Sequence, residues 1–220
     1  STWEQMDNTM APMPPSGQSN VGPLFRSVDL TASPSRTFPR LPALVNNQSP
    51  TWEVLPEVER TMKFTFSVRD NNPLHGCTAD DDMLVTVSVV GGSFRINNPD
   101  TSGISYEVNQ VAEVKWDVAN TDLSPVNCAF VNITLSVDGG YTYPYLLAYQ
   151  QPNSGVAEVT IPNVLSRQAR IRVQGYENVF FDISNKNFSI VPSTVPGFTL
   201  EVGPSVQDIC LPSVVEIYFE

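Results

Sequence analysis

The sequence predicts an all-β protein of tandem β-sandwich domains, and three observations support this prediction. Apolar and polar residues alternate over several short runs, which is the pattern of a half-buried strand. Residues that favour turns (Gly, Pro, Asn and Asp) separate these runs at the spacing of a sandwich. No stretch has the apolar periodicity of a long helix. We expect Trp116 to be buried, with Val114, Ile133, Leu135 and Ile171 near it.

Length and charge narrow the classes of function. The chain has 220 residues, 41% hydrophobic and 10% aromatic, which is enough for two domains with cores of their own. Its formal net charge of -11 argues against nucleic-acid binding, which needs basic residues that displace phosphate counterions. No run reaches the roughly 20 apolar residues of a membrane span. We therefore expect neither a nucleic-acid partner nor membrane insertion.

Residues 1–91 are expected to form the first sandwich, which is loop-rich and truncated at its start. A short strand around Trp3 begins so soon after Ser1 that we expect an excised fragment of a longer protein. Proline-rich irregular chain fills most of residues 1–50, because proline fixes φ and removes a backbone donor. Three apolar side chains are expected to pin this loop onto the body: Phe25, Phe38 and Leu41.

After this loop, apolar and polar residues alternate clearly and predict strands at 62–69 and 83–89. A polar loop that carries His75, Cys77 and the acidic run Asp80–Asp82 is expected to join them. The glycine pair Gly91-Gly92 then marks the predicted domain boundary.

Residues 93–192 are expected to form the second sandwich, and residues 193–220 a linker with the opening strands of a truncated third domain. We predict immunoglobulin-like folds for both sandwiches, with a fibronectin type III-like variant for the second. The strand signals of the second sandwich lie at 94–96, 106–118, 131–137, 156–161, 169–173 and 180–190.

The turn after the 131–137 strand fits the pattern S-x-D-x-G-x-T-aromatic, running from Ser136 to Tyr143. Sialidase-like propellers carry several such boxes, whereas this chain has one, so we favour a structural hairpin. Gly139 and Gly140 accept the positive φ that a tight turn needs. We expect the Asp138 carboxylate to accept the backbone donors of these glycines, or of residues beyond them, and to fix the strand register.

The sequence offers no residues for catalysis. His75 is the only histidine, whereas a metalloprotease needs two helical histidines to hold its zinc. A serine or cysteine nucleophile would have only His75 as its base, and the G-x-S-x-G motif is absent. We therefore assign no catalytic, cofactor-binding or metal-binding residue, and we expect the chain not to be an enzyme.

Two sets of polar residues leave alternatives open. Asp70 and the run Asp80–Asp82 offer oxygens that calcium prefers, but the EF-hand spacing is missing, so we favour a solvated acidic loop. Cys77, Cys128 and Cys210 lack any C-x-x-C pair and fall in different predicted segments. We favour unpaired thiols, although the sequence does not settle whether any of them pair.

Four tyrosines follow the hairpin turn: Tyr141, Tyr143, Tyr145 and Tyr149. Their rings would suit stacking on sugars. We favour packing at the core and the hairpin edge, because alternation places several of them on one sheet face.

A series of short motifs occurs in order along nearly the whole chain: Phe25-Arg26-Ser27, Arg36-Thr37-Phe38-Pro39, Trp52-Glu53-Val54-Leu55-Pro56, Arg60, Phe66-Ser67-Val68-Arg69-Asp70-Asn71, Val114-Lys115-Trp116-Asp117-Val118-Ala119, Pro125-Val126-Asn127-Cys128, Leu135-Ser136-Val137-Asp138-Gly139-Gly140, Pro152-Asn153-Ser154-Gly155 and Phe180-Phe181-Asp182-Ile183-Ser184. With these motifs the chain resembles the region downstream of the catalytic domain in secreted reprolysin-like zinc metallopeptidases of Bacteroidetes-type bacteria.

The resemblance implies secretion, a multidomain architecture and accessory immunoglobulin-like domains. The protease of that family lies upstream with an HExxH motif, which this chain lacks, so no catalytic residue carries over. We expect a non-catalytic module that spaces, stabilises or targets a secreted or cell-surface metallopeptidase, with neighbouring domains of the same polypeptide as partners. The alternative is a cell-surface adhesion or carbohydrate-binding module, with an extracellular protein or glycan as partner.

Overall fold

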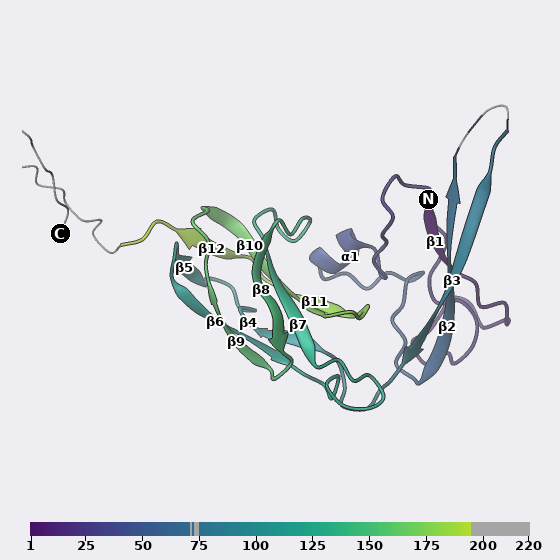
Figure 1. Cartoon of the computed structure of the whole chain (residues 1–220). Coiled ribbons are helices and arrows are strands. Elements are labelled where there is room, and N and C mark those ends of the chain that lie inside the picture. The colour runs from purple at the N-terminus through teal and green to yellow at the C-terminus, as the bar shows by residue number, and fades with distance from the viewer. Residues whose placement is uncertain (71, 73–74, 195–220) are drawn as a thin grey trace, which may run out of the picture.

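The computed structural model describes residues 1–70, 72 and 75–194. These residues form twelve strands and one five-residue helix (Figure 1), which confirms the all-β prediction. No helix within them is long and apolar enough to cross a bilayer. The opening strands expected for a third domain lie outside the described residues.

The elements are β1 (Thr2–Gln5), α1 (Leu41–Val45), β2 (Arg60–Arg69), β3 (Thr78–Val87), β4 (Arg95–Asn98), β5 (Ser105–Glu107), β6 (Val111–Asp117), β7 (Phe130–Ser136), β8 (Tyr145–Pro152), β9 (Val156–Thr160), β10 (Ser166–Gly175), β11 (Phe181–Ile183) and β12 (Phe188–Val191).

One antiparallel sheet, in the order β1-β2-β3, forms the frame of the first segment, residues 1–91. Its alternation places Met62 and Phe64 on one face, where both are buried. Leu24 and Phe25, from the loop between β1 and β2, are buried against them. Within the described residues this segment is therefore a single sheet covered by irregular chain, where we had expected two packed sheets. The loop replaces a second sheet because it supplies the apolar surface that covers the face.

A buried ion-pair cluster holds this loop in place. The Glu53 carboxylate is almost fully buried and accepts hydrogen bonds from Arg36 at 2.8 Å and Arg40 at 3.1 Å. Arg36 also donates to the carbonyl oxygens of Trp3 and Arg26, each at 2.7 Å. Through Arg36, the carbonyls of Trp3 on β1 and of Arg26 in the irregular chain are thus linked to the Glu53 carboxylate. Phe38 lies under the Arg36 guanidinium, whereas Leu41 begins α1.

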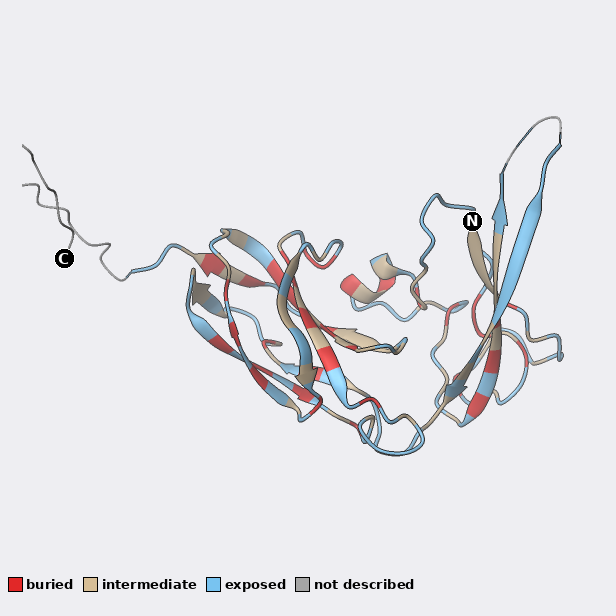
Figure 2. Cartoon of the chain, in the orientation of Figure 1, coloured by how far each residue is buried: buried red, intermediate tan, exposed pale blue. Residues whose placement is uncertain are grey.

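The acidic run lies within a strand, which corrects the expected polar loop. β3 already begins at Thr78 and pairs with β2 over ten residues without a register shift. Asp80, Asp81 and Asp82 are all exposed on it, and Figure 2 shows β3 exposed along most of its length. A strand that is open to solvent on both faces carries no apolar alternation, so its first half gave no signal in the sequence.

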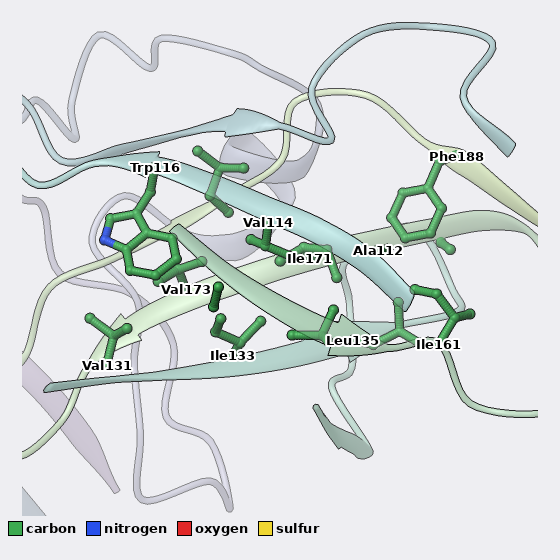
Figure 3. Packing of buried hydrophobic residues seen from close by; sticks show 14 of the residues in the cluster. Ala112, Val114, Trp116, Val131, Ile133, Leu135, Ile161, Ile171, Val173 and Phe188 are labelled. Carbon is green, nitrogen blue, oxygen red and sulfur yellow. The ribbon is translucent and has the colours of Figure 1, made fainter. Parts of the chain in front are cut away.

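The second segment, residues 93–192, consists of two sheets that enclose one core. The larger sheet has the order β5-β12-β10-β7-β8 with β11 paired to β10, and the smaller has the order β4-β6-β9. Figure 3 shows Trp116 among the buried side chains between the sheets. Trp116 is 3% exposed, and Val114, Ile133, Leu135 and Ile171 in the same cluster are at most 1% exposed, which confirms the predicted core.

The polar atom of Trp116 is also satisfied inside this core. Its indole Nε1 donates to Asn153 Oδ1 at 2.8 Å, and the Asn153 amide donates to Thr121 Oγ1 at 2.9 Å and to the Cys128 carbonyl at 3.0 Å. Asn153 is 5% exposed, so this network replaces the water that both groups lose on burial.

The two segments contact each other through α1, which Figure 1 shows beside β10 and β11. Arg170 Nη1 on β10 donates to the carbonyl oxygen of Val45, the last residue of α1, at 2.8 Å. Asn47 Nδ2 donates to the Asn185 carbonyl at 3.0 Å. A Cβ on Gly140 would lie 2.9 Å from a Val45 methyl, so the glycine permits this close approach.

Candidate functional site

The hairpin turn between β7 and β8 is organised around one carboxylate. Asp138 Oδ1 accepts the backbone N–H groups of Tyr141 and Thr142 at 3.0 Å each. The Ser136 hydroxyl donates to Oδ1 and the Thr142 hydroxyl to Oδ2, both at 2.6 Å. The predicted carboxylate cap is therefore present, with its backbone donors beyond the two glycines.

The glycines of this turn use other partners. Gly139 N–H donates to the Gln168 carbonyl and Gly140 N–H to Ser136 Oγ, each at 2.8 Å. Both glycines have positive φ, at 83° and 100°, as the hairpin prediction required. Gly140 N–H is held by a hydroxyl that also binds Asp138, so the carboxylate supports this glycine through Ser136.

The hydrogen bonds around Asp138 determine its pKa. Burial acts to raise it, but the donors from Ser136, Thr142 and Tyr141 together outweigh burial and lower the pKa from 3.8 to about 2. Three hydrogen bonds to Oδ1 and one to Oδ2 thus tie this carboxylate to the backbone and side chains of its own turn.

The four tyrosines after the turn do not share one environment. Tyr141 is 49% exposed and Tyr149 is 57% exposed, whereas Tyr143 and Tyr145 are half-buried. Tyr149 pairs edge-on with Tyr176, and their hydroxyls lie 3.3 Å apart. The predicted packing therefore applies to Tyr143 and Tyr145, whereas Tyr141 and Tyr149 expose ring surface.

The Tyr143 ring packs against an arginine side chain. Its ring centroid lies 4.3 Å from the guanidinium carbon of Arg172, and the Phe181 ring lies 5.9 Å from the same atom. Burial raises the pKa of the Tyr143 hydroxyl, although Arg172 and Arg170 oppose the rise. Burial likewise lowers the pKa of Arg172. Arg172 therefore sits between two rings on the outer face of the larger sheet.

His75 is exposed, and its backbone N–H donates to the Asn72 side chain at 3.3 Å. Asp70 Oδ1 accepts the backbone N–H groups of Asn72 and Cys77 at 3.1 and 3.0 Å. These bonds lower the pKa of Asp70.

The acidic run and the cysteines form no shared site. Asp82 pairs with Lys63 at 2.7 Å and accepts the Thr65 hydroxyl at 2.6 Å. Within the described ranges, no three His, Cys, Asp or Glu side chains gather in a way that could hold a metal ion. Cys77 is an exposed free thiol and Cys128 a buried one, and Cys210 lies outside the described residues.

Comparisons with known proteins do not add a family. No protein-family model matches the chain, and no curated protein matches it.

Our sequence reasoning did not single out Arg170 and Arg172. Both lie in the run Ala169-Arg170-Ile171-Arg172-Val173, which we interpreted only as a strand. The signal was present, because alternation with buried Ile171 and Val173 places both arginines together on the opposite sheet face. The presence of two arginines on a sheet face next to the Asp138 turn could therefore have indicated this region from the sequence.

Proposed function

We propose that the chain is a non-catalytic accessory module of a secreted or cell-surface metallopeptidase, with neighbouring domains of the same polypeptide as its partners. In this proposal the second segment is an immunoglobulin-like or fibronectin type III-like sandwich, and the first segment is a loop-covered sheet that extends it. The two-sheet core around Trp116 supports the sandwich assignment.

The observation that carries the proposal is the hydrogen-bonded contact between the segments. Arg170 is 8% exposed and donates through Nη1 to Val45 and through Nε to Asn187, so its guanidinium bridges α1 and the second segment. Asn47 adds a second bond between the segments. A spacer that sets the distance between functional domains needs such internal contacts, because a flexible linker would let the domains move independently.

The open reading frame that contains this chain tests the proposal. We expect it to encode an HExxH peptidase domain upstream of Ser1. Deleting the residues corresponding to 1–194 should change hydrolysis of a short peptide by less than about twofold, because the chemistry lies elsewhere. The same deletion should reduce the heat resistance or the surface retention of the peptidase. A reading frame without a peptidase domain would overturn the proposal.

A second candidate function is a cell-surface adhesion or carbohydrate-binding module, which the exposed rings of Tyr141 and Tyr149 favour. A glycan array probed with the chain and with Tyr141→Ala and Tyr149→Ala tests it. Specific binding that either substitution abolishes would support this function, and an array without signal would argue against it.

A further inference from the structure

Arg172 is a half-buried cation without an anionic partner. It projects from β10 on the face opposite to Ile171 and Val173, and burial lowers its pKa. Its Nε is buried without a hydrogen-bond partner. Within the described residues the side chain of Arg172 forms neither a hydrogen bond nor an ion pair. Burying a charge is costly unless a partner compensates it, so this guanidinium requires an explanation.

Each of the other arginines of the chain either has a hydrogen-bond or ion-pair partner or lies exposed to solvent. Arg36, Arg40 and Arg60 form ion pairs with carboxylates. Arg170 binds a carbonyl and an amide oxygen. The remaining four lie exposed to solvent: Arg26, Arg69, Arg95 and Arg167. Among the residues that the structure describes, Arg172 is thus the arginine that is half-buried and still unpaired.

The two rings leave the outer end of the guanidinium available. Tyr143 and Phe181 contact Arg172 at 4.3 and 5.9 Å between ring centroid and guanidinium carbon. The buried atom without a hydrogen-bond partner is Nε. Nη1 and Nη2 also form no hydrogen bond within the protein, but they are not fully buried. Rings that hold the guanidinium in place reduce the conformational freedom it would lose on binding a ligand.

Two further polar atoms of this patch lack partners. Thr134 is the direct cross-strand neighbour of Arg172, and its Oγ1 is buried and unpaired. The Tyr143 hydroxyl is buried and unpaired as well. Leu146 on β8 pairs with Thr134 on β7 and is 59% exposed, so the row across β8, β7 and β10 places accessible apolar surface near the cation.

The chemistry of this patch fits a carboxylate. The terminal nitrogens of an arginine form a planar fork that matches two carboxylate oxygens. A chain with a net charge of -11 repels polyanions, but a ligand with a single negative charge meets less repulsion. Leu146, which is exposed beside this row, offers apolar surface on which one face of a sugar ring can pack.

We propose that Arg172, flanked by Tyr143 and Phe181, binds the carboxylate of a uronic-acid sugar on the outer face of the larger sheet. The sugar carboxylate accepts from Nη1 and Nη2, and its ring lies against the exposed surface beside Thr134 and Leu146. This site does not depend on whether the polypeptide carries a peptidase.

NMR titration of the isotope-labelled chain tests the site with three probes: the methyl glycosides of glucuronate and galacturonate, and methyl glucoside as the uncharged match. We expect one of the uronates to give saturable shifts at the amides of Thr134 and Arg172, with an affinity at least about tenfold higher than that of the glucoside. Equal binding of the uncharged glycoside, or no saturation by about 50 mM uronate, would overturn the proposal.

Variants separate the site from general electrostatics. Arg172→Gln should weaken uronate binding by at least about tenfold, and Arg172→Lys, which keeps the charge but loses the fork, by about threefold or more. Arg167→Gln makes the same charge change on the same strand at an exposed position and should bind like the parent.

A fourth probe distinguishes a sugar from a protein ligand. N-acetylglutamate amide carries the same carboxylate on a flexible side chain, and we expect it to bind more weakly than the uronate. If it bound as tightly at the same amides, the partner would be an acidic peptide and the sugar assignment would be wrong.

Discussion

Arg170 and Val45 lie 125 residues apart in the sequence, and a hydrogen bond of 2.8 Å joins Nη1 of the first to the carbonyl oxygen of the second. Val45 ends α1, so this bond caps the helix with a side chain from the other segment. The relationship makes the small helix a part of the contact between the segments rather than a feature of the loop alone.

Arg170→Met should release this contact. The change removes both donors from a position that is 8% exposed and leaves the Val45 carbonyl without its partner. We expect a loss of about 1–3 kcal/mol in the free energy of unfolding. Hydrogen exchange should become faster at residues 43–48, and Arg167→Met on the same strand should leave it unchanged. Unaltered exchange in Arg170→Met would mean that other contacts hold α1.

Glu53→Gln should destabilise the first segment strongly. The substitution keeps the shape of the side chain but leaves Arg36 and Arg40 without the buried carboxylate that both contact. Breaking one partner of a buried ion pair costs about 3–5 kcal/mol. Urea unfolding measures the loss, and the exposed Glu59→Gln serves as the matched control. A loss as small as that of the control would contradict the role of this cluster.

Asp138→Ala should lower stability by about 1–3 kcal/mol, because the backbone donors of Tyr141 and Thr142 lose their acceptor. Thermal unfolding at pH 7 measures this loss. The exposed Asp122→Ala, at a position outside the turn, is the control. A variant that melts like the parent but loses ligand binding would show that the turn is a site instead.

The pH dependence of the same carboxylate has a defined sign. The folded-state pKa of Asp138, about 2, lies below its value of about 3.9 in an unfolded chain. Its contribution is therefore present above about pH 4 and is lost as the pH falls toward 2. Asp138→Asn should flatten this part of the stability curve. The effect is smaller than the pKa shift alone implies, because solvent screens an exposed carboxylate.

Asp182→Asn should change the pH dependence of stability in the direction opposite to that of Asp138→Asn. Burial raises the pKa of Asp182, while the backbone N–H groups of Ile96 and Ile183 partly oppose the rise. A raised folded-state pKa contributes stability below the unfolded pKa, and this contribution is lost as the pH rises through the folded value. An asparagine keeps an acceptor for Ile96 and removes the buried charge. Melting temperatures should thus favour the variant at pH 7 but not at about pH 3.

The sequence predicted the parts of the fold whose strands are buried on one face. Runs such as Val131, Ile133 and Leu135 alternate with polar residues because only one face meets the core, and Trp116 lies where the pattern placed it. The Asp138 cap was predictable for a related reason, since its donors come from the next four residues.

Contacts between distant residues were not predictable in the same way. The cover of the first sheet depends on where Leu24 and Phe25 fold back, and irregular chain carries no period that fixes this. α1 is only five residues long and contains Pro42 in its first turn. It is therefore too short to be recognised from the sequence within a proline-rich stretch. The Arg172 patch joins residues of β7, β10 and the turn, which only the sheet register brings together.

The exposed run of carboxylates on β3 bears on how copies of the protein behave at high concentration. β3 ends its sheet among the described strands, and the outer edge of such a strand is a template on which a second molecule can assemble. If two copies paired through it, Asp80 and Asp81 of each would lie near those of the other, and their repulsion would oppose the encounter. Salt screens this repulsion, so edge-to-edge aggregation should begin first at high ionic strength.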